Sequence, residues 1–124
     1  MLKMLDNPAL QTPPFYSQAV AATGSTTLYI SGQVGVGPDG AVPESVGEQT
    51  KLAVANVNAM LAEAGMDRSN IAKLTIYLTD PAHIGEFAQA AGAPASPPPA
   101  TTLLIVKALG APNLLVEIEA IAVK

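Results

Sequence analysis

The chain has 124 residues, a net charge of −4 and no cysteine, which fit one ordinary domain and exclude disulfides and a thiolate nucleophile. Its six basic residues form no cluster and its single histidine is His83, so we expect no nucleic-acid surface, no metal and no cofactor. No apolar run reaches membrane-spanning length, and Met1–Leu5 is too short for the core of a signal peptide, which predicts a cytoplasmic protein.

The N-terminal part of the chain is predicted to hold an irregular segment and one strand. Three prolines among the first 14 residues indicate an irregular lead-in to a single domain that spans residues 1–124. Residues 15–22 have a strand-like composition, and residues 23–26 have the composition of a turn. The sequence therefore predicts a hairpin between residues 15–22 and the strand that begins near Leu28.

Residues 28–37 pass from a strand into a bend, with their most polar side chains at the transition. Alternation from Leu28 indicates a strand with two distinct faces, and Gly32 permits a close approach that a Cβ would block. Ser31 and Gln33 then present a hydroxyl and an amide beside backbone N–H groups at a strand end. This arrangement suits a small polar ligand, and it also suits side chains that only satisfy backbone groups at a sheet edge.

A glycine pattern and a long helix come next. Residues 35–40 spell G-x-G-x-x-G, but Pro38-Asp39-Gly40 is typical of a turn, whereas a dinucleotide-binding motif must open a helix. The helix is predicted to begin at Ser45, which forms a capping box with Glu48, and to end at Gly65. Small and apolar residues recur along one helix face at the spacing of a buried stripe: Thr50, Ala53, Val54, Val57, Leu61 and Ala64.

Three more elements are predicted before the last strand. Residues 71–79 alternate between an apolar and a polar face, which predicts a strand that an Asp-Pro pair ends. A short helix is expected over residues 83–91, with His83 exposed at its start. A Gly/Ala/Pro-rich linker leads to residues 101–106, which are apolar on both faces, as expected of a strand covered on both sides.

The last strand, residues 114–123, carries two acids on one face. Glu117 and Glu119 alternate with Val116 and Ile118 in an otherwise apolar segment. A face of this kind meets solvent, a pocket or another subunit, and solvated glutamates on an open sheet explain it equally well.

The order of elements predicts an α+β domain in which a mixed sheet carries both helices on one face. Only 13% of the residues are charged, against about 25% in typical soluble domains. Such a chain has few charges with which to cover the other face of the sheet. We therefore expect another copy of the chain to cover that face.

Several segments occur in a characteristic order: Phe15–Val20, Ser31-Gly-Gln33, Gln49 with Asn56, Ala64-Gly65, Thr75–Asp80 and Val116–Ala122. In order and approximate spacing they resemble the YjgF/RidA family, from about Phe15 to the C-terminus apart from residues 83–100. The resemblance implies a chorismate-mutase-like fold and a homotrimer with small-molecule clefts between subunits. Typical members hydrolyse reactive enamine/imine intermediates, such as 2-aminoacrylate, to 2-keto acids and ammonia.

The resemblance also implies which residues form the cleft. Tyr16, Ser31, Gly32 and Glu117 match residues that line it in the family, and Glu117 is implied to position or activate the attacking water. Tyr16 and Ser31 are implied to supply a polar wall. The candidate catalytic residues are Glu117, Tyr16 and Ser31, and the candidate substrate-binding residues are Gly32, Thr101 and Leu103.

One departure from the family pattern bears directly on function. Active members carry Pro-x-Arg before the penultimate strand, where the arginine binds the substrate carboxylate, but this chain has Pro99-Ala-Thr101. Lys107 lies six residues further on, about 20 Å at strand rise, and cannot substitute locally. The family's cysteine on this strand corresponds to Leu103, and its helix asparagine to about Ala88.

Losing a charge-assisted bond worth about 1.5–3 kcal/mol should weaken capture of an imino acid by roughly tenfold to more than a hundredfold. Two functions therefore stay open. The first is hydrolysis of an imine or enamine that lacks the usual carboxylate or binds it differently. The second is a non-catalytic trimer that binds a small metabolite.

Overall fold

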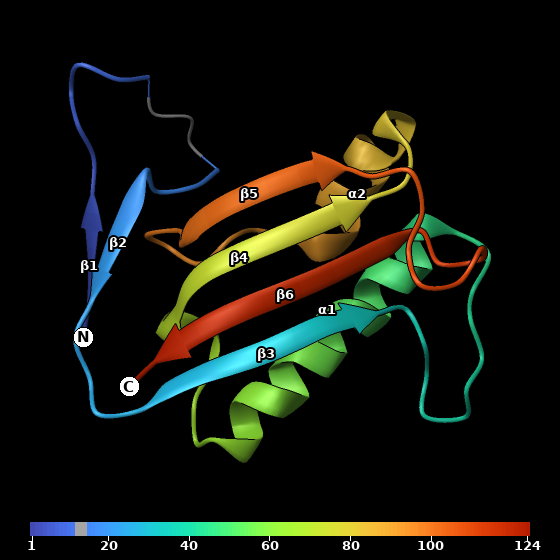
Figure 1. The fold of residues 1–124 in the computed structure, drawn as a ribbon, viewed down its shortest axis with the longest axis horizontal. Coiled ribbons are helices and arrows are strands. Elements are labelled where there is room, and N and C mark those ends of the chain that lie inside the picture. The colour runs from blue at the N-terminus through green and yellow to red at the C-terminus, as the bar shows by residue number, and fades with distance from the viewer. Residues whose placement is uncertain (12–14) are drawn as a thin grey trace.

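Four strands form the central sheet of the computed structural model, which describes residues 1–11 and 15–124. Their order is β3 (Thr27–Val34), β6 (Val116–Val123), β4 (Ile71–Leu78) and β5 (Ala100–Ile105) (Figure 1). β6 pairs antiparallel with both β3 and β4, whereas β4 and β5 run parallel. The predicted mixed sheet is confirmed.

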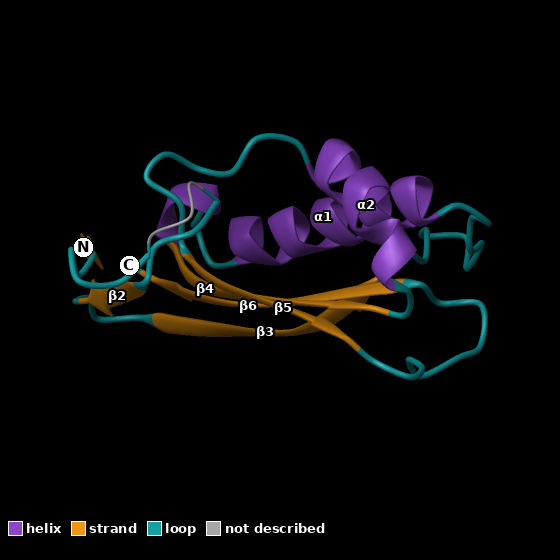
Figure 2. Cartoon of the chain, turned by 90° about the horizontal axis from the view of Figure 1, so that it is seen from above, coloured by secondary structure: helices purple, strands orange, loops and turns teal. Residues whose placement is uncertain are grey.

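Both α-helices cover the same face of this sheet (Figure 2). The predicted long helix is α1 (Val46–Glu63), and the short one is α2 (Ile84–Ala91). At the start of α1 the Ser45 hydroxyl accepts a hydrogen bond from the Glu48 backbone N–H at 3.1 Å. The Glu48 carboxylate accepts from Lys51 Nζ at 3.2 Å, so only half of the predicted capping box forms. The face of the sheet that carries no α-helix is called the open face below.

The core lies between α1 and the sheet. The predicted stripe of α1 is buried at Thr50, Ala53, Val57 and Leu61. Gln49 is also fully buried, and all its polar groups have partners. Its Nε2 donates to the carbonyls of Pro43 and Asn113, at 2.8 and 2.9 Å, and its Oε1 accepts from Leu115 N–H at 2.8 Å. Gln49 thereby joins α1 to the loops before it and before β6.

The N-terminal hairpin differs from the prediction. β1 (Leu2–Leu5) pairs antiparallel with β2 (Ala19–Ala22), so the first 14 residues are not irregular throughout; residues 12–14 lie outside the described residues. β2 does not pair with β3. At Gly24 the chain passes very close to the backbone of Lys124, directly after β6: an added Cβ would lie 2.7 Å from it. The turn after β2 thus leads β3 onto the end of β6, and the hairpin lies beyond the sheet (Figure 1).

β5 is not covered on both faces within the single chain, so the predicted covering depends on another copy of the chain and stays a prediction. It is an edge strand, and Leu104 and Ile105 are 46% and 44% exposed in the single chain. The part of the chain that the structure describes therefore covers these two apolar side chains only in part.

Candidate functional site

The six predicted site residues lie on opposite faces of the sheet. In the register of β4 and β5, Thr101 pairs with Leu74 and Leu103 with Ile76, and this set faces the helices. Glu117 pairs with Tyr77 and lies on the open face. One chain therefore separates Thr101 and Leu103 from Glu117.

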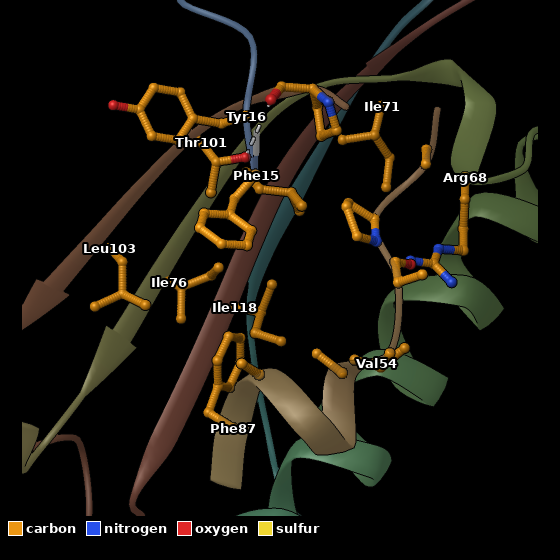
Figure 3. A pocket seen from close by; sticks show the side chains of 18 of the residues that line it. Phe15, Tyr16, Val54, Arg68, Ile71, Ile76, Phe87, Thr101, Leu103 and Ile118 are labelled. Atoms are coloured by element: carbon orange, nitrogen blue, oxygen red, sulfur yellow. Dashed lines mark hydrogen bonds between the residues drawn. The ribbon is translucent and has the colours of Figure 1, made fainter. Parts of the chain in front are cut away.

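Thr101, Leu103 and Tyr16 line a cavity of about 790 Å³ between the sheet, the two helices and residues 92–95, called the helix-side cavity below (Figure 3). This volume lies in the usual range of small-molecule sites. Most of its wall is apolar, from residues that include Phe15, Ile76, Ile84, Phe87 and Ile118. Ala88, where the family has asparagine, also lines it.

The segment before β2 places Tyr16 at this cavity. Ser17 bridges to Ala100 at the start of β5, and its backbone N–H donates to the Pro99 carbonyl at 3.1 Å. The Ser17 hydroxyl donates to the Pro98 carbonyl at 2.5 Å. The Thr101 hydroxyl donates to Pro99 at 3.1 Å, so this position offers a hydroxyl oxygen and no positive charge.

Glu117 and Gly32 are in contact on the open face. The pairing of β3 with β6 shifts its register between Ile30 and Gln33, so Ser31 and Gly32 lie at a β-bulge. A Cβ built on Gly32 would lie 2.4 Å from Glu117 Oε2, which shows how closely the carboxylate approaches the backbone. The close approach that Gly32 was predicted to permit is present.

The polar side chains beside this contact have different roles. Gln33 Nε2 donates to the Ser31 carbonyl at 3.0 Å. The amide therefore satisfies a backbone group at the sheet edge, which is the simpler of the two interpretations that the sequence left open. Ser31 itself is exposed and lines a smaller depression, about 270 Å³, with Tyr29, Lys73 and Glu119 among its neighbours.

The two acids of β6 differ in their hydrogen bonding. Tyr77 Oη donates to Glu119 Oε1 at 2.6 Å, and this bond raises the pKa of Tyr77. Among the described residues no hydrogen bond or ion pair engages the Glu117 carboxylate. Sequence alternation placed Tyr77 and Glu119 on polar strand faces but could not give the register that brings them together. Glu117 is the acid left available for a ligand or water.

We expect Glu119→Gln to lower the pKa of Tyr77 toward its ordinary value of about 10, because the carboxylate favours the protonated phenol. The contribution of this bond to stability is present below the unfolded-state pKa of the phenol and is lost as pH rises through the higher folded-state pKa. Ultraviolet absorbance of the phenolate during an alkaline titration measures the shift. Tyr77→Phe identifies which transition belongs to Tyr77, and an unchanged transition in Glu119→Gln would contradict the assignment.

His83 is not the exposed residue that was predicted. It precedes α2 without a side-chain cap, and it is half-buried, with an inaccessible Nδ1 that has no hydrogen-bond partner among the described residues. Within residues 1–11 and 15–124 no three His, Cys, Asp or Glu side chains gather closely enough to hold a metal ion. No helix in those residues has the length and apolar character needed to cross a bilayer.

Comparisons with known proteins agree with this architecture. A sequence profile of the family described as "Endoribonuclease L-PSP" matches residues 7–124. A "RutC family protein" of Aquifex aeolicus (strain VF5) is 42% identical over 113 residues, 88% of each chain. A "2-iminobutanoate/2-iminopropanoate deaminase" of Rattus norvegicus is 42% identical over 67 residues, 52% of this chain and 47% of the relative.

The fold has solved counterparts. The crystal structure of YyfB from Yersinia pestis, described as a protein of unknown function of the conserved Rid family, superposes with a TM-score of 0.86. It is 29% identical, and the match covers 99% of this chain and 98% of that one. The sequence match over nearly the whole chain and the shared fold together show that this protein belongs to the YjgF/RidA family.

Proposed function

We propose that the protein hydrolyses a reactive imine or enamine to a carbonyl product and ammonia. Water adds its oxygen to the imine carbon, the C–N bond breaks, and the nitrogen leaves as ammonia: R₂C=NH + H₂O gives R₂C=O + NH₃. The observation that carries the proposal is the Glu117 carboxylate, held against Gly32 at the bulge and free of partners among the described residues. Glu117 accepts a proton from the attacking water, with Ser31 of the same chain and Tyr16 of a second chain as the polar wall of the cleft.

The proposed site needs more than one subunit. Glu117 and the helix-side cavity lie on opposite sides of the sheet, so a second chain must bring its open face to the cavity of the first. The exposed apolar side chains of Leu104, Ile105 and Tyr29 support such an assembly, because single domains rarely leave a large apolar surface in water. A homotrimer is the assembly that the family resemblance implies.

We expect multi-angle light scattering at micromolar concentration to give a mass close to three times the 12.6 kDa of one chain. Burial of the apolar edge strand β5 is the physical reason. Leu104→Asp should shift the mass toward that of one chain, because a charge at the interface lacks a partner. A wild-type protein of one chain mass would overturn the proposed assembly.

The proposed substrate is not the usual 2-imino acid, because Thr101 supplies no charge to hold a carboxylate beside the reacting carbon. We expect slow ammonia release from freshly generated 2-aminoacrylate, and Thr101→Arg should accelerate it, by tenfold at most, because Leu103 and Ala88 also differ from the family pattern. Thr101→Gln adds a side chain without charge and is the matched control. A wild-type rate like that of an arginine-bearing relative would show that another group binds the carboxylate.

A second candidate is a non-catalytic metabolite-binding trimer. The observation that favours it is the apolar cavity without a cation at Thr101, which suits binding of a neutral compound. Ammonia release from imines that carry no carboxylate discriminates the two, since a binding protein leaves their spontaneous hydrolysis unchanged.

A further inference from the structure

Arg68 is the only charged side chain among the described residues that line the helix-side cavity. It lies in a short 3-10 helix, η1 (Arg68–Asn70), directly before β4. Its Nη2 donates to the Ala93 carbonyl at 3.3 Å. Across residues 1–11 and 15–124 the one ion pair joins Lys51 to Glu48, so no carboxylate neutralises Arg68.

Arg68 and Thr101 lie on different sides of the cavity. Figure 3 shows Arg68 across the cavity from Thr101 and Leu103, with apolar side chains such as Ile71, Ile76 and Ile118 along the wall. The family pattern has its cation at the position of Thr101, whereas this chain has its cation at the far side. A ligand that fills the cavity therefore meets a polar uncharged end, an apolar middle and a guanidinium.

We propose that the ligand is an amphipathic acid whose carboxylate binds Arg68 and whose reacting carbon, separated from it by an apolar spacer, lies at the Thr101 side. This inference rests on the proposed function in taking the cavity as the substrate-binding half of the cleft. The substrate is then the imine of a distal keto acid, CH₃–C(=NH)–(CH₂)n–COO⁻, rather than a 2-imino acid. Hydrolysis consumes one water and gives the keto acid and ammonia, with the carboxylate unchanged.

The chemistry of arginine supports this role. A guanidinium has five N–H donors in a planar fork that matches a carboxylate in two parallel bonds, and the bond to Ala93 uses only one of its terminal nitrogens. The apolar wall adds affinity for the spacer, since burying each CH₂ is favourable. The alternative is that Arg68 only anchors residue 93, and that role predicts a change in stability without any preference among ligands.

Two matched probes test the proposal directly. 7-Oxooctanoate and 2-octanone share the methyl ketone and the chain, and differ in that a carboxylate replaces the terminal methyl group. We expect isothermal titration calorimetry to show that the wild type binds 7-oxooctanoate roughly tenfold more tightly than 2-octanone. Arg68→Gln should remove the preference. Lys107→Gln, which deletes an exposed cation outside the cavity, should keep it.

Other results would overturn the inference. These are equal or undetectable binding of both probes to the wild type, or a preference that persists in Arg68→Gln. Arg68→Lys keeps the charge without the fork and should keep part of the preference, which provides a second test if Arg68→Gln is poorly folded. A loss of preference in Lys107→Gln as large as in Arg68→Gln would show a general charge effect instead of a site.

Binding and turnover separate this inference from the proposed function. Glu117→Gln should lose turnover and still bind 7-oxooctanoate more tightly than 2-octanone, because Glu117 acts on the attacking water whereas Arg68 supplies the contact to the ligand carboxylate. If the preference depends on Arg68 but no imine releases ammonia faster than spontaneously, the carboxylate site stands and the hydrolase proposal is wrong. If imines are hydrolysed without any Arg68-dependent preference, the hydrolase stands and the substrate class is wrong.

Discussion

Gly35→Ala is expected to destabilise the protein by about 3 kcal/mol, a large fraction of the stability of an ordinary domain. Gly35 is buried where the chain leaves β3 and passes α1. A Cβ at this position would lie 2.4 Å from the Cβ and 2.5 Å from the Cα of Gln49. Because one of these atoms is helix backbone, a rotamer change cannot relieve the overlap, and α1 must move away.

The movement would also strain the buried hydrogen bonds of Gln49. Its amide holds the carbonyls of Pro43 and Asn113 and the N–H of Leu115, and each bond contributes about 1 kcal/mol. A shift of α1 therefore weakens three tertiary contacts at once and adds to the cost of overpacking. This coupling is why we expect an effect at the upper end of the usual range for an added methyl group.

Urea denaturation at fixed protein concentration measures the loss, with the concentration held constant because assembly contributes to stability. Gly85→Ala is the matched control: it lies within α2, and an added Cβ there meets nothing within 4 Å. Gly85 is the second residue of α2, so alanine there should raise the stability by at most the roughly 0.5–1 kcal/mol that separates alanine from glycine in a helix interior. Equal midpoints for Gly35→Ala and the wild type would show that α1 does not pack as closely as the structure indicates.

The elements that follow from local chemistry were predictable from the sequence. Ser45 caps the start of α1, as the capping preference of serine predicts. The helix ends before Gly65, which has a φ of +66°, a value that glycine adopts easily. β4 follows from strict alternation. The pairing of β2 was not predictable in the same way, since the path at Gly24 depends on Lys124, which lies a hundred residues away in the sequence.

The site was predictable in its residues but not in its geometry. Alternation in β6 places Glu117 on the face opposite Val116 and Ile118. Because these two apolar residues face the helices, Glu117 lies on the open face. Residues 101–106 lack such a contrast, because both faces of that strand are mainly apolar, and so the face of Thr101 was open until the register with Leu74 was known. Arg68 lies in the short 3-10 helix η1, which shows no periodic sequence pattern, and only the fold brings it to the cavity.

The contact between Gly32 and Glu117 gives the most direct test of the proposed chemistry. We expect Gly32→Ala to reduce imine hydrolysis by roughly a hundredfold or more while the fold remains intact, because general acid–base groups typically contribute 10²–10⁴-fold. The added Cβ would meet Glu117 Oε2 at 2.4 Å and Cδ at 2.5 Å, atoms at the end of a flexible side chain. The side chain can rotate away, so the strand is retained and the carboxylate is displaced.

A double-mutant comparison identifies this cause. If Gly32→Ala acts only by moving the carboxylate, the double variant with Glu117→Gln should be no slower than Glu117→Gln alone, since both changes remove the same group. Gly110→Ala, where an added Cβ meets nothing within 4 Å, should keep the wild-type rate of ammonia release. A Gly32→Ala variant with the wild-type rate, or a double variant far slower than Glu117→Gln, would mean that Glu117 does not direct the water from its place at the bulge.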